Sequence, residues 1–326
     1  MNSKGTKRKY RSEAVWPTRG EDTTAVPPII EPAVYTPVSC SDTKFVYFDM
    51  ETTSLYKDGD IVQLSAVYDE HTFDLYVLPI KPIQEDAEEV NGLQVKNRQL
   101  CYRGEVVDTV STKQCITQFI QWLKTFVPGN IILVQHNCRS FDAPRLLNHV
   151  TKTGKRLEFM ETVLGFCDTL RLFGARYKAK YESFSKKSLV KEILHREMVH
   201  HNDANAVREL ILACKVTEDC MMQHTFSVES VLQDNKRWRS KLQNEPSLKQ
   251  LIQHNVCSRK MVHKIASSGL NYSHLRGAYF GGGLAGLTTI LSAKDATGNE
   301  RVTKHKQTIS AIFDFLEARV RQERQF

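Results

Sequence analysis

The sequence lacks several signatures that would place it in a familiar class of proteins. None of its eight cysteines forms a C-x-x-C pair, which argues against a zinc ribbon or a thioredoxin-like site. No uninterrupted apolar run approaches the ~18 residues that cross a bilayer. The polar, basic amino terminus shows no apolar segment typical of secretory signals. We therefore expect reduced thiols in a nuclear or cytoplasmic protein that is not secreted and has no membrane partner.

The chain is long enough to form a hydrophobic core, and it carries an excess of positive charge. Its 326 residues, 41% of them apolar, suffice for one large domain or two ordinary ones. The formal net charge of +8 favours a polyanionic partner. Residues 1–43 are rich in proline and poor in periodic apolar positions, so we expect a disordered tail there. Its first eleven residues are basic without an acid, which leaves open a nuclear import signal or a nucleic-acid arm.

Residues 44–216 show the pattern of a sheet domain with helices. Strands come first in this segment, and strands alternating with helices follow, as in an α/β or α+β sheet. Alternating or continuous apolar runs predict strands over 45–49, 61–68, 72–78 and 131–134, with a turn at 70–71. Helical spacing predicts helices over 116–126, from about 143, over about 187–195 and over about 203–216.

Residues 217–326 are expected to form a mostly helical C-terminal region. Apolar stripes at helical spacing occur within 248–256 and within 309–320, and such stripes are usually core or a face for a partner helix. Gly281-Gly282-Gly283 lies between them without the lysine of a phosphate-binding loop, so we interpret it as a flexible connection.

Two acids at the end of the first strand carry the main functional signal. Asp49 and Glu51 follow the apolar run 45–48, and residues i and i+2 of a strand share one face. Buried like charges are costly unless a positive charge lies between them. A divalent metal held by hard oxygen ligands is the simplest explanation.

Two later segments extend this signal. Asp142 follows the buried strand 131–134 through a polar turn and enters a helix, where it either joins the two acids or caps the helix. His200 precedes another helix, and a neutral histidine beside a metal site can act as general base.

In combination these segments resemble the motifs of the DEDDh family of 3′→5′ exonucleases, which have a ribonuclease H-like fold. Asp-Met-Glu-Thr-Thr-Ser-Leu from Asp49 resembles the first motif, and His-Asn-x-x-x-Phe-Asp-x-Pro from His136 resembles the second. The domain spacings are similar to the three-prime repair exonucleases. Residues 155–166 and the region after 217 also resemble the C-terminal exonuclease-like domain of the promyelocytic leukaemia protein family.

The resemblance implies a fold, a set of ligands and a chemistry. The fold would be an α/β ribonuclease H-like mixed sheet flanked by helices, with a helical C-terminal extension. Asp49, Glu51, Asp142 and Asn205 would hold two Mg²⁺ or Mn²⁺ ions, and His200 would take the proton of the attacking water. The family has an acid five residues after the histidine, whereas this chain has Asn205. The lost charge predicts weaker metal binding and a slower reaction, or none.

The predicted substrate is a nucleic-acid single strand or 3′ end, with DNA favoured over RNA. The segment from Arg171 to Lys191 holds seven Lys or Arg and one acid, interleaved with aromatic residues, which suits phosphate contacts and base stacking. A solvated loop with inward-packed aromatics is the alternative. The predicted contacts are Met50 through its backbone, Leu55, His136, Asn137, Lys178, Lys180, Lys186 and Lys187.

Three functional hypotheses remain open at this stage. The chain is a metal-dependent exonuclease, a degenerate nuclease domain that binds nucleic acid, or a protein-interaction module that uses its C-terminal helices. The three acids and the histidine favour the first hypothesis, and Asn205 favours the second. The sequence does not indicate an oligomeric state.

Overall fold

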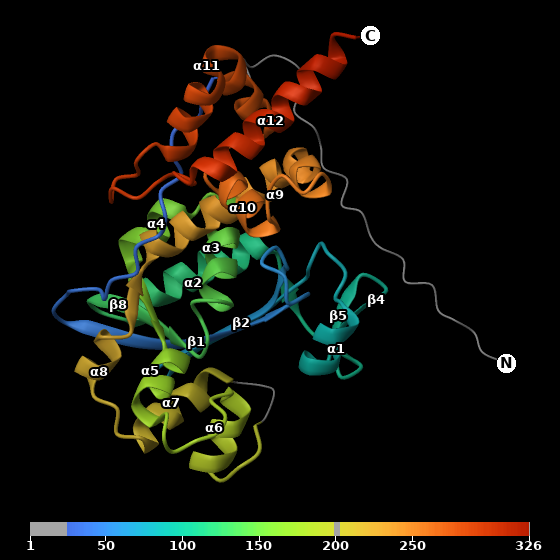
Figure 1. Ribbon diagram of the computed structural model, residues 1–326. Coiled ribbons are helices and arrows are strands. Elements are labelled where there is room, and N and C mark those ends of the chain that lie inside the picture. Colours follow the sequence, from blue (N-terminus) through green and yellow to red (C-terminus); the bar gives the residue numbers. More distant parts are fainter. Residues whose placement is uncertain (1–24, 199–202, 326) are drawn as a thin grey trace. The chain divides into compact units, whose positions relative to one another are not determined.

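The computed structural model describes residues 25–198 and 203–325 (Figure 1). The chain divides into two compact units. The first unit comprises residues 30–240, and the described part of the second comprises residues 25–29 and 241–325. Each unit has its own apolar core.

A seven-stranded mixed sheet forms the centre of the 30–240 unit. Its strand order is β10-β9-β8-β1-β2-β3-β7. β1 pairs in parallel with β8 and antiparallel with β2, and β8 pairs in parallel with β9. The strand bounds are β1 Thr43–Thr52, β2 Ile61–Tyr68, β3 His71–Val77, β7 Thr109–Val110, β8 Asn130–Gln135, β9 Val163–Asp168 and β10 Thr225–Ser227.

Helices cover both faces of this sheet (Figure 1). On one face lie α2 (Thr112–Phe126), α3 (Asp142–Lys152), α4 (Arg156–Thr162) and the first part of α9 (Val228–Gln253). On the other face lie α5 (Thr169–Tyr177), α6 (Lys186–Ile193), α7 (Asp203–Ala213) and α8 (Glu218–Met222). This arrangement confirms the predicted α/β sheet flanked by helices.

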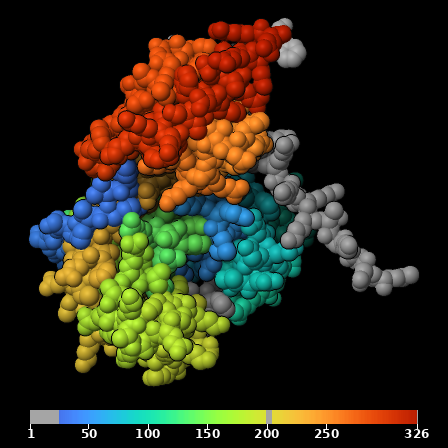
Figure 2. Space-filling model, viewed as in Figure 1, coloured from blue at the N-terminus to red at the C-terminus, as the bar shows by residue number. Residues whose placement is uncertain are grey.

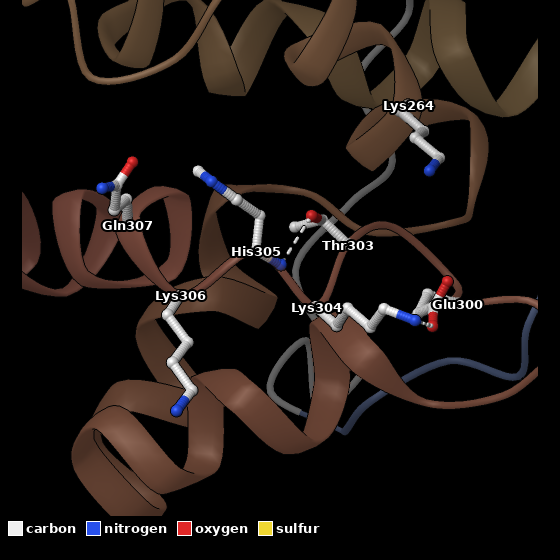
Figure 3. A pocket seen from close by; sticks show the side chains of 7 residues that line it. All are labelled: Lys264, Glu300, Thr303, Lys304, His305, Lys306 and Gln307. Carbon is white, nitrogen blue, oxygen red and sulfur yellow. Dashed lines mark hydrogen bonds and ion pairs between the residues drawn. The ribbon is translucent and has the colours of Figure 1, made fainter.

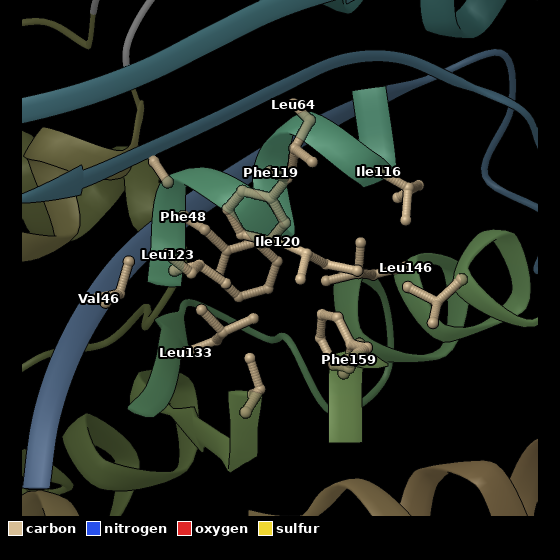
Figure 4. Packing of buried hydrophobic residues seen from close by; sticks show 14 of the residues in the cluster. Val46, Phe48, Leu64, Ile116, Phe119, Ile120, Leu123, Leu133, Leu146 and Phe159 are labelled. Atoms are coloured by element: carbon tan, nitrogen blue, oxygen red, sulfur yellow. The ribbon is translucent and has the colours of Figure 1, made fainter. Parts of the chain in front are cut away.

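The larger core lies between the sheet and α2, α3 and α4. Phe48 and Leu133 from the central strands meet Phe119 and Ile120 of α2 and Phe159 of α4, all of them fully buried (Figure 4). The sequence directs α2 into this position, because its apolar residues recur at helical spacing on one face. Ser111 and Gln114 form a capping box that satisfies free backbone N–H groups at its first turn.

A second, three-stranded sheet was not foreseen. It has the order β4-β5-β6 and follows the short helix α1. Its strands are short and only Leu93, Leu100 and Cys101 are buried within them, so no apolar periodicity marks them in the sequence. The bounds are α1 Glu85–Asn91, β4 Leu93–Lys96, β5 Gln99–Tyr102 and β6 Glu105–Val106.

The boundaries of the sheet unit differ from the 44–216 expected from the sequence. Residues 30–42 pack along α9 and β10 of the same unit, although they have no regular secondary structure. The Tyr35 hydroxyl donates to the Asp234 carboxylate, and the Val38 N–H donates to Thr225 Oγ1 at 2.8 Å. Val34 offers its carbonyl to the Ser230 hydroxyl at 2.6 Å. We expected a disordered tail here. The sequence did not predict this packing, because the residues that make these contacts follow no periodic pattern.

The second unit is helical, as predicted. It contains the end of α9 together with α10 (Arg259–Ser267), α11 (Tyr272–Ser292) and α12 (Lys306–Glu323). The two apolar stripes supply its core, with Leu248, Leu251, Ile309 and Ile312 all buried. None of the helices within 25–198 and 203–325 is both long enough and apolar enough to cross a bilayer.

The triple glycine is a kink inside α11 and not the free connection we expected. Gly282 and Gly283 leave helical geometry, with φ of −164° and +57°. The positive φ at Gly283 favours glycine over residues that carry a Cβ. Gly286 allows close approach after the kink, because a Cβ there would lie 2.2 Å from the Ala278 carbonyl oxygen. The kink therefore brings two helical segments against each other.

We predict that Leu133→Ala lowers the free energy of unfolding by about 2–5 kcal/mol. Leu133 is fully buried at the centre of the larger core, so its truncation leaves a cavity. Urea unfolding followed by circular dichroism measures the change. Leu157→Ala, at a side chain that is 76% exposed, is the control. Equal effects of the two changes would contradict the core described above.

Candidate active site

Asp49 and Glu51 lie on one face of β1, as the strand period predicts. Phe48 and Met50 point into the α2–α4 core, whereas Tyr47 packs toward the layer of α5–α8. Because side chains alternate along a strand, Asp49 and Glu51 face the same side as Tyr47. The parallel pairing of β1 with β8 ends at Tyr47 and Val134. Asp49 therefore lies just beyond the carboxyl end of that pairing, where β8 gives way to a turn.

Asp142 joins Asp49 at this edge of the sheet. It is the first residue of α3 and only 4% exposed, while the N-cap position belongs to Phe141. Burial, and next the negative charge of Asp49, raise the pKa of Asp142 well above its usual range, against the opposing influence of Lys186 and Arg145. The two carboxylates are thus close enough to repel each other. This is the pairing proposed from the sequence, and helix capping does not account for Asp142.

Two donors meet Asp49 in this arrangement. The Lys186 ammonium lies 3.3 Å from Asp49 Oδ1, and both side chains are largely buried, with exposures of 17% and 12%. The Gln135 amide at the end of β8 donates to the same oxygen. Lys186 was expected to contact nucleic acid. In this structure it contributes positive charge to the carboxylate site.

Asp168 shapes the turn that leads to Asp142, although it was not among the predicted site residues. Its carboxylate accepts from the backbone N–H groups of Asn137 at 2.9 Å and Arg139 at 3.2 Å. It also caps α5 by accepting from Leu170 N–H at 3.0 Å. Burial raises its pKa, and these three backbone donors oppose that rise. An Asp directly before a helix start was the available signal, because Asp is favoured at N-caps.

Side chains of α3 also hold the loop after β1. Arg145, which is 2% exposed, donates to the carbonyls of Phe141 and Leu55. His149 Nε2 lies 3.0 Å from the Gly59 carbonyl oxygen. Asn148 donates to the Lys57 carbonyl at 3.0 Å. The helix that carries Asp142 therefore fixes the segment that begins at Glu51, and it leaves the Leu55 side chain 66% exposed.

The predicted substrate contacts lie in different environments. The Met50 side chain is buried in the core, which leaves its backbone as the predicted contact. The ring of His136 is engaged by the protein, with Nδ1 3.0 Å from Thr169 Oγ1 and Nε2 2.7 Å from the Phe184 carbonyl oxygen. Asn137 adopts a positive φ of 62° in the turn.

The basic segment 171–191 has exposed lysines and inward-packed aromatics. Lys178, Lys180 and Lys187 are exposed. Residues of this segment, coloured yellow-green, form part of the visible surface of the space-filling view (Figure 2). The aromatic residues follow the alternative that we left open: Phe173 is fully buried, and Tyr177, Tyr181 and Phe184 are half-buried against the same core cluster and one another.

Two predicted site residues remain, His200 and Asn205. His200 lies outside the described residues. Asn205 is half-buried in the first turn of α7, which packs against the sheet through Ala206, Val207 and Leu210. Within the described ranges, no three His, Cys, Asp or Glu side chains are grouped closely enough to hold a metal ion. The fit to a divalent ion therefore rests on the Asp49 and Asp142 carboxylates. Mg²⁺ is often bound by one or two carboxylates when substrate phosphates supply further ligands.

A cavity of about 570 Å³ lies within the C-terminal unit (Figure 3). Its lining is mostly basic, from Lys264, Lys304, His305 and Lys306, and Lys304 pairs with Glu300 at 3.0 Å. These four side chains are exposed, Lys264 on α10 and the other three around the start of α12. Nothing in this lining resembles the buried carboxylates of the sheet unit.

Comparison with known proteins supports the fold of both units. Residues 43–194 match the family model of the Exuperantia RNAse H-like domain, and residues 244–319 match the model of the PML C-terminal domain, that of the promyelocytic leukaemia protein. These matches confirm the ribonuclease H-like resemblance of the sheet domain and the resemblance of the C-terminal region to the promyelocytic leukaemia protein. A search of curated proteins found no matching sequence.

Solved structures of E. coli exonuclease I also match. The complex with a dT13 oligonucleotide matches at 13% identity and a TM-score of 0.44, covering 54% of this chain and 41% of the exonuclease. The complex with a dA16 oligonucleotide matches at 14% identity and a TM-score of 0.44, covering 64% and 46%. The chain thus spans less than half the length of these exonuclease chains.

We predict that the stability of the protein falls as pH decreases from about 6.5 to 4, partly through His136. Burial, more than any other cause, lowers the pKa of His136 to about 4. Between these values the unfolded chain binds a proton that the folded protein excludes, so acid favours unfolding by up to about 3 kcal/mol for this group. Urea unfolding at a series of pH values measures the slope. His136→Gln should flatten it, and an unchanged slope would contradict the assignment.

Proposed function

We propose that this chain is a metal-dependent 3′→5′ exonuclease that acts on nucleic acid, with DNA favoured over RNA. Its rate is reduced because Asn205 stands where related nucleases have an acid. The observation that carries the proposal is the burial of Asp49 and Asp142 beside each other at the carboxyl ends of the central parallel strands. A helix or sheet needs no such pair for its stability.

The buried acids favour a cation at this position. An unpaired charge in the protein interior carries a large desolvation cost, and two like charges add repulsion. Asp49, Asp142 and, on the same face of β1, Glu51 would hold Mg²⁺ or Mn²⁺, and the Asn205 amide would offer a carbonyl oxygen. When bound, two such ions supply the charge that activates a water and offsets the negative charge developing on the phosphate.

The other residues of the proposal bind and orient the substrate or move a proton. His200 is proposed to accept the proton of the attacking water, since histidine titrates near neutral pH. The Met50 backbone and the exposed Leu55 side chain are proposed to flank the terminal nucleotide, with the loop held by Arg145. Exposed Lys178, Lys180 and Lys187 would contact phosphates of a single strand or 3′ end.

A second candidate function is nucleic-acid binding without hydrolysis. The Lys186–Asp49 ion pair favours it, because this ammonium contributes positive charge without a metal. In that case the C-terminal helices would serve as a surface for a protein partner. Either function fits our proposal of a nuclear or cytoplasmic protein, since all eight cysteines are free thiols in the described structure.

We expect the full chain to shorten a 5′-labelled single strand of DNA from its 3′ end when Mg²⁺ or Mn²⁺ is present, and not when EDTA is present. Asp49→Asn and Asp142→Asn should each lower the rate at least ~100-fold. Mutating a residue that only supports a metal ligand already costs up to ~100-fold in activity, and these two residues are the proposed ligands themselves. Product ladders on denaturing gels measure the rate. Glu70→Gln, at an exposed acid, is the charge-matched control. Binding of the strand without shortening would reject the enzyme in favour of the second candidate.

Asn205→Asp should raise the metal-dependent rate on the order of tenfold, because a fourth carboxylate would strengthen the hold on a hard cation. The same gel assay compares this variant with Gln121→Glu, which makes the same change at an exposed position of α2. No increase in an otherwise active protein would show that Asn205 is not the position of the missing ligand.

A further inference from the structure

Lys186 stands in an unusual position for a lysine. It is the first residue of α6, after the N-cap Ser185, whose hydroxyl accepts from the Ser188 N–H at 3.2 Å. The N-terminal end of a helix carries partial positive charge, so a cation there is disfavoured. Its side chain is nevertheless only 17% exposed, although a lysine normally keeps its ammonium in water. An attraction must offset both costs.

The carboxylates of the candidate site supply that attraction. The ammonium lies 3.3 Å from Asp49 Oδ1, and its charge also acts on Asp142 and on His136. These groups come from β1, α3 and the turn after β8, so the ammonium approaches the point at which the three elements converge. It therefore lies in the region where the acids would hold a cation.

Other lysines nearby do not share this environment. Lys187 is exposed, and Lys191, also on α6, is 70% exposed with Glu197 Oε1 3.9 Å away. The inward position of Lys186 is therefore a property of one residue and does not reflect the general basicity of the segment.

A lysine and a divalent ion compete for such a site. Both are attracted to the Asp49 carboxylate, and two cations beside one carboxylate repel each other. With Asp49, Glu51 and Asp142 ionised and Lys186 nearby, these four groups sum to −2. If Lys186 withdraws, the sum is −3, so its departure strengthens the attraction for an Mg²⁺ or Mn²⁺ ion.

We propose that Lys186 is a built-in counter-ion that stabilises the acid pair in the metal-free protein and must leave Asp49 before a divalent ion binds. The inference rests on the proposed function in one respect, namely that these acids hold a metal. It adds a regulatory device: Lys186 sets the metal concentration at which the site fills. Once displaced, its ammonium is available to a phosphate of the substrate, so nucleic acid and metal would favour the same rearrangement.

The first test measures Mn²⁺ binding to the full chain without nucleic acid, by isothermal titration calorimetry. Lys186→Met keeps the length of the side chain and removes its charge, and we expect it to tighten Mn²⁺ binding on the order of tenfold, since a charged hydrogen bond no longer has to break. Lys191→Met, which changes the net charge equally on the same helix, should bind as the unsubstituted chain does. Equal affinity of all three proteins would overturn the proposal.

The second test needs no substitution and so does not depend on a variant that folds. Reductive methylation followed by mass spectrometry reports the accessibility of each lysine. Mn²⁺ should increase labelling of Lys186 several-fold and leave Lys191 unchanged, because displacement exposes the ammonium. Labelling of Lys186 that stays constant or falls at saturating Mn²⁺ would contradict the proposal.

These readouts separate the inference from the proposed function. Tighter Mn²⁺ binding by Lys186→Met with no hydrolysis by any variant would support the counter-ion and reject the exonuclease. Metal-dependent hydrolysis with equal Mn²⁺ affinities would support the exonuclease and reject the counter-ion.

Discussion

The repulsion between two buried carboxylates is the constraint on which this site depends. Asp49 and Asp142 are each less than one-tenth exposed, and each raises the cost of ionising the other. A fold keeps such a pair only when a positive charge or a proton compensates it. In this protein Lys186 supplies positive charge, and the raised pKa of Asp142 favours a proton. In our proposal a divalent cation replaces both.

The backbone around the acids is built to maintain this arrangement. β1 and β8 run parallel, so their carboxyl ends meet at one edge of the sheet. Asp168 at the end of β9 fixes the turn after β8 by accepting from two of its backbone N–H groups. Arg145 of α3 then ties the loop after β1 to the helix that starts with Asp142. These hydrogen bonds hold the turn after β8 and the loop after β1, the segments that adjoin the two acids.

Strand periodicity was sufficient to predict that Asp49 and Glu51 lie on one face of β1, because alternate residues of a strand point to the same side. Apolar patterns also predicted both ends of β2 correctly and the start of α2 to within a few residues. They could not find the three-stranded sheet, whose strands bury few side chains, nor the packing of residues 30–42, which has no period. They also could not distinguish Lys186 from Lys187. Adjacent lysines have equal charge, and only the direction of α6 decides which one faces the acids.

Asn205 and Lys186 change the site in the same direction. Asn205 removes a negative charge from the expected ligand set, and Lys186 adds a positive one beside Asp49. In our proposal both lower the affinity of the site for a divalent ion, so the site would need more metal, or a substrate phosphate that attracts the ammonium, before it fills. The two changes differ in reversibility, because an amide cannot regain its charge whereas a lysine side chain can move. On this proposal the loss at Asn205 would limit how strongly the metal is held, and the position of Lys186 would determine when the metal can enter.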